Sequence, residues 1–128
     1  MTETSMPARA VVLIVEDEPL VRMMVIELFE DEGFEVLEAA DADQALAIFR
    51  ERRDVALLFT DVEMPGSLDG YALARWAEAN RPTVRTVIVS GRAMPRAGDL
   101  PEGATFVGKP YDHDDVMRRI QTLMASRP

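Results

Sequence analysis

The chain has 128 residues, of which 48% are hydrophobic and 29% are charged, a balance that suits one domain with a substantial core. The net charge of −9 argues against direct binding to nucleic acid, which needs a basic surface, and zero cysteines exclude disulfides, thiolate metal sites and cysteine nucleophiles. There is no apolar run of membrane-spanning length and no signal-peptide pattern, so we expect a cytoplasmic protein with no membrane partner.

The first half of the chain alternates strand patterns with helix patterns. Residues 10–15 are a continuous run rich in Val and Ile, typical of a strand that is covered on both faces. Pro19 suits the first turn of a helix, and Gly33 ends that helix. Residues 34–39 alternate like a half-exposed strand, and Asp41 is expected to cap the next helix.

The second half repeats this alternation. Residues 55–61 form a buried strand that ends in an acid, and residues 71–80 follow as a helix that an Arg-Pro pair closes. Residues 84–90 and 104–108 are predicted as the fourth and fifth strands. Residues 114–124 form the last helix, with its apolar side chains on one face.

The alternation predicts an α/β fold with a doubly wound parallel sheet, helices on both faces and right-handed crossovers. Five strands of this size suit the flavodoxin-like (βα)5 arrangement, in which the strand order is 2-1-3-4-5. No linker interrupts the pattern. We therefore expect one domain over residues 9–126, a disordered segment over residues 1–8, and no output domain.

Polar residues stand at the ends of four predicted strands. Glu16 and Asp17 follow the first strand, Asp61 ends the third, Ser90 ends the fourth, and Lys109 follows the fifth. In a doubly wound sheet these ends meet at one crevice. Clustered carboxylates repel one another, and a hard divalent cation such as Mg²⁺ relieves the repulsion. The alternative is that Asp17 and Asp61 only cap the helices that follow them.

Lys109 is the only lysine in a chain whose Lys and Arg residues total 14. Biased codon usage accounts for the scarcity of lysine, but it does not account for the place of this one. A lysine at the same sheet edge as three acids indicates a role for a compact positive charge.

Four segments, "LIVEDEP", "FTDVEMPG", "VIVSG" and "FVGKPY", resemble the motifs of the response-regulator receiver domain of two-component signalling, and they occur in the same order. The resemblance covers about residues 10–124. It implies a phosphoryl acceptor rather than an enzyme, limited to self-phosphorylation and slow self-dephosphorylation. It also implies a histidine kinase or a histidine phosphotransfer protein as donor, and an unknown protein as downstream partner.

The resemblance assigns roles to the strand-end residues. Asp61 matches the aspartate that accepts the phosphoryl group. Asp17 and Asp61 would bind Mg²⁺ directly, Glu16 through water, and Glu63 by its backbone carbonyl. Lys109 would neutralise the phosphoryl oxygens on the side away from the metal ion, as a point charge that a planar guanidinium does not reproduce.

The resemblance also implies a conformational switch. Ser90 matches the residue whose hydroxyl moves to bond the phosphoryl group, and the small Gly91 leaves room for that group. Phe106 matches the aromatic residue that swings inward when the hydroxyl moves; the alternative is an ordinary core aromatic residue on a strand. The peptide bond before Pro110 matches one that is often cis in this family.

Two segments depart from the family pattern. The turn "MPGSLDG", residues 64–70, carries one residue more than the common form and lies beside the phosphorylation site. Residues 91–103, where the fourth helix should lie, include three glycines and two prolines. Because this density of Gly and Pro opposes a helix, we predict that the fourth helix is short, irregular or absent.

Glu63 and Arg92 form a candidate gate. Glu63 lies two residues after Asp61, and Arg92 lies two residues after Ser90, so both should border the phosphoryl site. A pair across its mouth would restrict water and set the lifetime of the aspartyl phosphate. The alternative is that both are solvated surface charges.

The main hypothesis is a stand-alone receiver that is phosphorylated on Asp61 and then binds a partner, relays the phosphoryl group or drains it. The alternative is a pseudo-receiver, an interaction module that works without phosphorylation. A flavin-binding electron carrier is disfavoured because the acids at residues 16–18 would repel a flavin phosphate. A metal-dependent phosphohydrolase would need a further acid or base that the sequence does not show.

Overall fold

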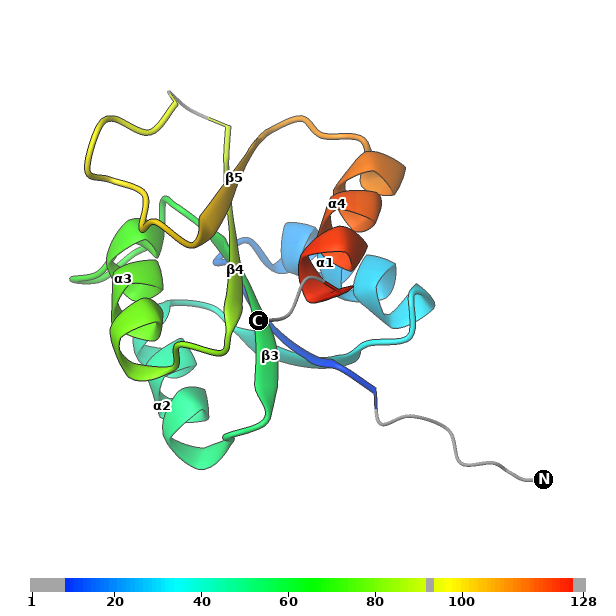
Figure 1. Cartoon of the computed structure of the whole chain (residues 1–128), viewed down its shortest axis with the longest axis horizontal. Helices are drawn as coiled ribbons and strands as arrows, with labels where there is room; N and C mark the ends of the chain where they lie inside the picture. Colours follow the sequence, from blue (N-terminus) through cyan, green and yellow to red (C-terminus); the bar gives the residue numbers. More distant parts are fainter. Residues whose placement is uncertain (1–8, 92–93, 126–128) are drawn as a thin grey trace.

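The computed structural model describes residues 9–91 and 94–125, and the predicted disordered segment 1–8 lies outside them. Figure 1 shows the chain. The strands are β1 (Val11–Val15), β2 (Glu35–Ala39), β3 (Val55–Asp61), β4 (Arg85–Ser90) and β5 (Ala104–Gly108), and the helices are α1 (Pro19–Asp31), α2 (Ala42–Glu51), α3 (Gly70–Asn80) and α4 (His113–Ala125). In the described residues, no helix has the length and apolar character needed to cross a membrane.

The strands form one parallel sheet in the order β2-β1-β3-β4-β5, which confirms the predicted fold class and strand order. The central strands β1 and β3 are almost wholly buried, as their continuous apolar runs predicted. The carboxyl ends of β1 and β3 are adjacent, since Val15 pairs with Thr60. This register brings the residues that follow β1 next to the end of β3.

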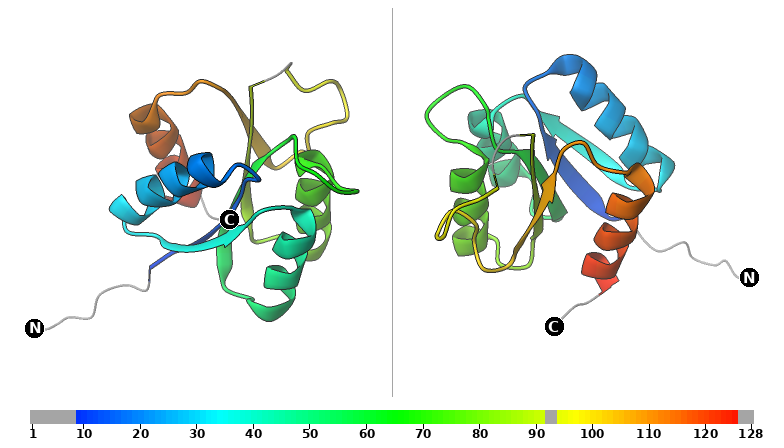
Figure 2. Two further views of the ribbon diagram at one scale, coloured as in Figure 1. Left: turned by 180° about the vertical axis from the view of Figure 1, so that it is seen from behind. Right: turned by 90° about the horizontal axis from the view of Figure 1, so that it is seen from above.

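The helices lie in two layers, one on each face of the sheet (Figure 2). On one face α1 and α4 contribute Phe29, Val116 and Ile120 to a core cluster. On the other face α2 and α3 contribute Phe49 and Leu73 to a second cluster. These side chains are at most 1% exposed, and burial of each stabilises the fold by roughly 1.5–3 kcal/mol.

No helix connects β4 to β5 in residues 94–103, so the predicted irregularity is confirmed for the described part of this segment. The segment folds as a loop beside α3, drawn in yellow in Figure 1. Arg75 of α3 donates to the carbonyl of Asp99 at 3.0 Å, and the N–H of Arg96 donates to the Asp99 carboxylate at 2.8 Å. Leu100 packs against a small core cluster that includes Val62 and Ile88. Packing and hydrogen bonds from α3 therefore hold this loop.

The start of α3 is fastened to the end of β3. The Asp69 side chain caps α3 by accepting from the N–H of Ala72 at 2.9 Å, so the helix begins at Gly70, one residue earlier than predicted. The N–H of Gly70 donates to the carbonyl of Val62 at 2.9 Å. A Cβ atom at Gly70 would overlap the carbonyl oxygen of Asp61 and lie 2.9 Å from Cα of Val62. Only glycine allows this approach.

We predict that Gly70→Ala destabilises the fold by roughly 1–3 kcal/mol, because the added methyl group must push the backbone of β3 and α3 apart. Urea unfolding would measure the loss. Gly103→Ala is the matched control, since its Cβ would meet no atom closer than Glu78 Oε2 at 3.8 Å. Equal stability of the two variants would contradict the interpretation.

Candidate functional site

Three carboxylates meet at the carboxyl end of β1 and β3. Glu16, Asp17 and Asp61 each offer one oxygen, and these oxygens all lie within 4.8 Å of one another. Glu16 and Asp61 are buried and Asp17 is exposed. The strand order thus brings together the acids that the sequence placed at separate strand ends.

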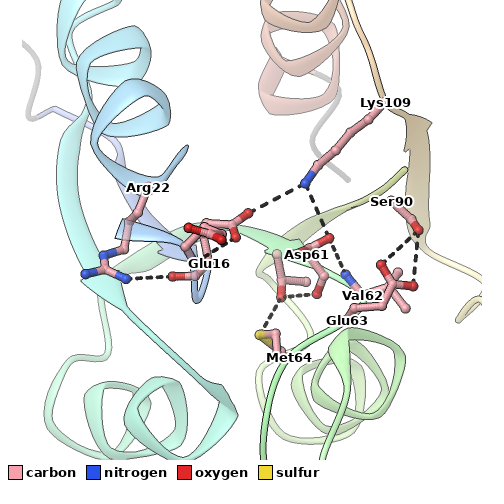
Figure 3. Close-up of polar contacts among 10 residues, drawn as sticks. Glu16, Arg22, Asp61, Val62, Glu63, Met64, Ser90 and Lys109 are labelled. Atoms are coloured by element: carbon pink, nitrogen blue, oxygen red, sulfur yellow. Dashed lines mark hydrogen bonds and ion pairs between the residues drawn. The ribbon is translucent and has the colours of Figure 1, made fainter. Parts of the chain in front are cut away.

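The loop from β1 to α1 holds Glu16 in place (Figure 3). The N–H of Glu18 donates to Glu16 Oε2 at 3.1 Å, and the Glu16 carbonyl accepts from Nη1 of Arg22 at 2.7 Å. Arg22 also pairs with Glu38 at 2.9 Å. The first turn of α1 and the end of β2 therefore fix the orientation of this acid.

Lys109 faces two of the acids from the end of β5. Its Nζ lies 3.6 Å from Glu16 Oε1 and 3.6 Å from Asp61 Oδ1 (Figure 3). The backbone N–H of Lys109 donates to the Ser90 carbonyl at 2.8 Å. The Lys109–Pro110 peptide bond is cis, as the family resemblance implied. The lone lysine places a positive charge 3.6 Å from each of two buried carboxylates.

The two buried carboxylates hold their protons more tightly than free carboxyl groups do. Burial raises the pKa of Asp61, the charge of Glu63 adds to this, and Lys109 and the Val62 N–H, which donates at 2.9 Å, oppose it. Burial likewise raises the pKa of Glu16, against the hydrogen bond from Glu18. A single lysine does not offset the cost of burying two negative charges.

The donor set fits a hard divalent cation. Three carboxylate oxygens in one cluster, two of them desolvated, are ligands that Mg²⁺ accepts together with water, and a cation would offset their repulsion. Glu63 contributes no carboxylate to this cluster, and binding through its backbone carbonyl remains a prediction.

Glu63 contacts the hydroxyl group of Ser90. Ser90 is 2% exposed, and its Oγ donates toward the Glu63 carboxylate, whose oxygens lie at 3.3 and 3.4 Å (Figure 3). The sequence paired Glu63 with Arg92, which lies outside the described residues. Sequence reasoning missed the contact with Ser90. The predicted strand order could have indicated this contact. Because β3 and β4 are neighbours and Asp61 pairs with Val89, the residues that follow these two lie close together.

Phe106 lies on the same face of the sheet as Ser90. Phe106 pairs with Ile88, and Ser90 pairs with Gly108, two residues further along both strands. The ring of Phe106 is partly buried and packs against the cluster of Val62 and Ile88. The structure thus places the predicted switch residues on adjacent strands, and their coupling remains a prediction.

Sequence reasoning did not select Tyr111, whose ring is partly buried near the acids. It packs edge-to-face on Phe59 with 6.4 Å between the ring centres. Burial raises the pKa of Tyr111, and the charges of Glu16 and Asp61 add to the effect. Its place at the end of the FVGKPY motif, two residues after Lys109, was the available signal.

A doubly wound sheet whose carboxyl edge carries an acid cluster, a lysine and a buried serine defines a receiver-type domain. The chain matches the response regulator receiver domain over residues 12–121, and it belongs to that family.

Among curated proteins the chain is similar to the nitrogen assimilation regulatory protein NtrX of Azorhizobium caulinodans, with 36% identity over 91% of this chain and 27% of NtrX. It is 30% identical to sporulation initiation phosphotransferase F of Bacillus subtilis, over 88% of this chain and 92% of that protein. Among solved structures, the receiver domain of the hybrid histidine kinase CckA aligns with a TM-score of 0.77 at 35% identity, covering 90% of this chain and 99% of that domain. The chain spans about a quarter of NtrX but nearly all of the Bacillus protein.

We predict that Asp61→Asn stabilises the domain when no divalent cation is present. Because the pKa of Asp61 is higher in the fold than in the unfolded chain, the ionised side chain destabilises the fold above that raised pKa. This cost disappears as the pH falls below the pKa of the unfolded chain. The variant should raise Tm by about 2–5 °C at pH 7 and by much less near pH 4.

Asp54→Asn is the control for this measurement. A hydrogen bond from Arg52 lowers the pKa of Asp54, so the ionised form of this acid is the favoured one in the fold. Removing its charge should not stabilise the fold at pH 7. A rise in Tm for both variants, or for neither, would show that burial of Asp61 carries no electrostatic cost.

Proposed function

We propose that Asp61 accepts a phosphoryl group from a phosphohistidine of a histidine kinase or histidine phosphotransfer protein, and that the domain then changes conformation. The observation that supports this most directly is the setting of Asp61. Asp61 is 7% exposed, and its carboxylate belongs to the acid cluster and lies 3.6 Å from Lys109 Nζ. In this proposal the residue that becomes phosphorylated belongs to the domain itself, and the domain modifies no separate substrate.

The transfer needs positioning and charge neutralisation more than it needs covalent help from the protein. An oxygen of Asp61 attacks the phosphorus atom, the phosphorus–nitrogen bond breaks, and the leaving imidazole keeps the electron pair and takes up a proton. Oδ1 of Asp61 is held by the Val62 N–H and by Lys109, which orients the carboxylate. The ammonium of Lys109 can stabilise charge on the transferred phosphoryl oxygens.

Mg²⁺ bound by Glu16, Asp17 and Asp61, together with the carbonyl of Glu63, would neutralise phosphoryl oxygens and lessen repulsion between the donor and the acids. The raised pKa values of Glu16 and Asp61 support this role, because the cluster is destabilised by its own charge.

Ser90 carries the response in this proposal. Its hydroxyl, which now faces Glu63, would turn to donate to a phosphoryl oxygen on Asp61, and Phe106 would move into the space that this opens. Leu100 of the loop 94–103 and Phe106 of β5 pack against one cluster. The movement of Ser90 and Phe106 would therefore shift this loop and β5 rather than a fourth helix. A downstream protein would recognise that surface.

Intact mass spectrometry after incubation with Mg²⁺ and acetyl phosphate tests the function. We expect an adduct of one phosphoryl group, which disappears in Asp61→Asn and when EDTA removes the cation. An unmodified chain that also fails to respond to beryllofluoride would instead support the pseudo-receiver, an interaction module independent of phosphorylation.

We predict that Glu63→Ala speeds phosphorylation by acetyl phosphate roughly two- to tenfold. The substitution removes a negative charge that raises the pKa of Asp61, and it removes the Glu63 carboxylate as an acceptor for the Ser90 hydroxyl. The same time courses give the dephosphorylation rate, which should also change if Glu63 and Arg92 gate water as proposed.

Glu51→Ala removes one negative charge from the exposed end of α2 and is the matched control. If Glu63→Ala and Glu51→Ala give the same rates of phosphorylation and dephosphorylation, Glu63 has no local role at the site. Arg92→Ala should alter only the dephosphorylation rate if it serves in the gate.

A further inference from the structure

A hollow of about 350 Å³ lies at the end of the sheet opposite the acid cluster. It is formed where β3 and β4 begin and where α4 ends, at the lower ends of β3 and β4 in Figure 1. Val55, which lines the hollow, lies six positions before Asp61 in β3, a rise of about 20 Å. The hollow is therefore separate from the proposed phosphorylation site.

The lining of the hollow carries positive charge. Arg53 and Arg85 both line it, and the acid among its lining residues is Asp54. The carboxylate of Asp54 accepts from Nε and Nη2 of Arg52, both at 2.9 Å, so its charge is already offset. A positive hollow stands out in a chain whose net charge is −9.

Arg53 combines a place in the hollow with a side chain that has no partner in the described residues, whereas several other arginines are paired. Arg22 pairs with Glu38, Arg52 with Glu35 and Asp54, and Arg118 with Asp115. Within residues 9–91 and 94–125, Arg53 makes no hydrogen bond or ion pair, and its side chain lines the hollow instead. An arginine in that position is available to an anion from solution.

The other lining residues add a hydroxyl group and an apolar wall. Thr83 can donate a hydrogen bond, and Val55, Ala56 and Met124 contribute apolar surface. Guanidinium groups bind phosphate and carboxylate oxygens through paired hydrogen bonds. The volume lies at the small end of the range for small-molecule sites.

We propose that this hollow binds a small organic oxyanion, a phosphate monoester or a carboxylate with a compact apolar group. Arg53 binds the oxyanion, and Val55, Ala56 and Met124 contact the apolar part. The site does not depend on phosphorylation of Asp61, because it uses none of the residues at the carboxyl edge.

The test follows the backbone amides of the full chain by NMR in buffer with EDTA, at constant ionic strength. Phenyl phosphate and benzoate are the two probes, since both join an oxyanion to a ring and neither donates a phosphoryl group to Asp61. We expect saturable shifts at Val55, Ala56 and Thr83, without comparable shifts at Val62 and Lys109. Saturation by phenyl phosphate alone assigns a phosphate ligand, and saturation by benzoate alone assigns a carboxylate.

Arg53→Ala should weaken binding about tenfold or more, the effect of losing one charge-assisted hydrogen bond, and Arg53→Lys should restore part of it. Arg50→Ala is the matched control, because Arg50 is an exposed cation in the last turn of α2 that does not line the hollow. Affinity should stay within about twofold in that variant. Equal weakening in Arg53→Ala and Arg50→Ala, or shifts that grow linearly without saturation, would overturn the proposal.

Discussion

The contact of one ammonium group with two buried carboxylates is the constraint on which the rest of the site depends. Lys109 lies between Glu16 and Asp61, and it offsets part of the cost of burying them. The pKa of both acids nevertheless remains raised, so the site retains unrelieved negative charge. A charge imbalance of this kind favours the binding of a cation. Carboxyl groups with shifted pKa values of this kind are also typical of functional sites.

The surrounding fold serves to keep these groups at short range. Each comes from the end of a different strand, so the parallel sheet determines their separation before any side chain is oriented. Local contacts then orient the acids: Glu18 and Arg22 hold Glu16, and the Val62 N–H holds Asp61. Gly70 completes the arrangement by letting α3 begin directly against the end of β3. Rigid backbone therefore carries most of the geometry of the site.

The fold and the acid cluster could be predicted because they depend on periodic patterns and on strand order. The bounds of β3 and β5 agree with prediction, since apolar residues and strand-end polar residues mark both. The contact of Glu63 with Ser90 was harder to predict, because it depends on the direction of both side chains. The hollow at Arg53 could not be foreseen, because loops and the end of α4 meet there without any sequence motif.

Charged side chains are distributed unevenly along the strand direction. Glu16, Asp17 and Asp61 gather at one end, and Arg53 and Arg85 lie at the other. A cluster of acids attracts a basic surface before contact, which raises the rate of encounter at low ionic strength. The Debye length is about 10 Å at 0.1 M salt, so this attraction weakens as the salt concentration rises. Added salt should therefore lower the rate of association with a basic partner more than it lowers the specificity of binding.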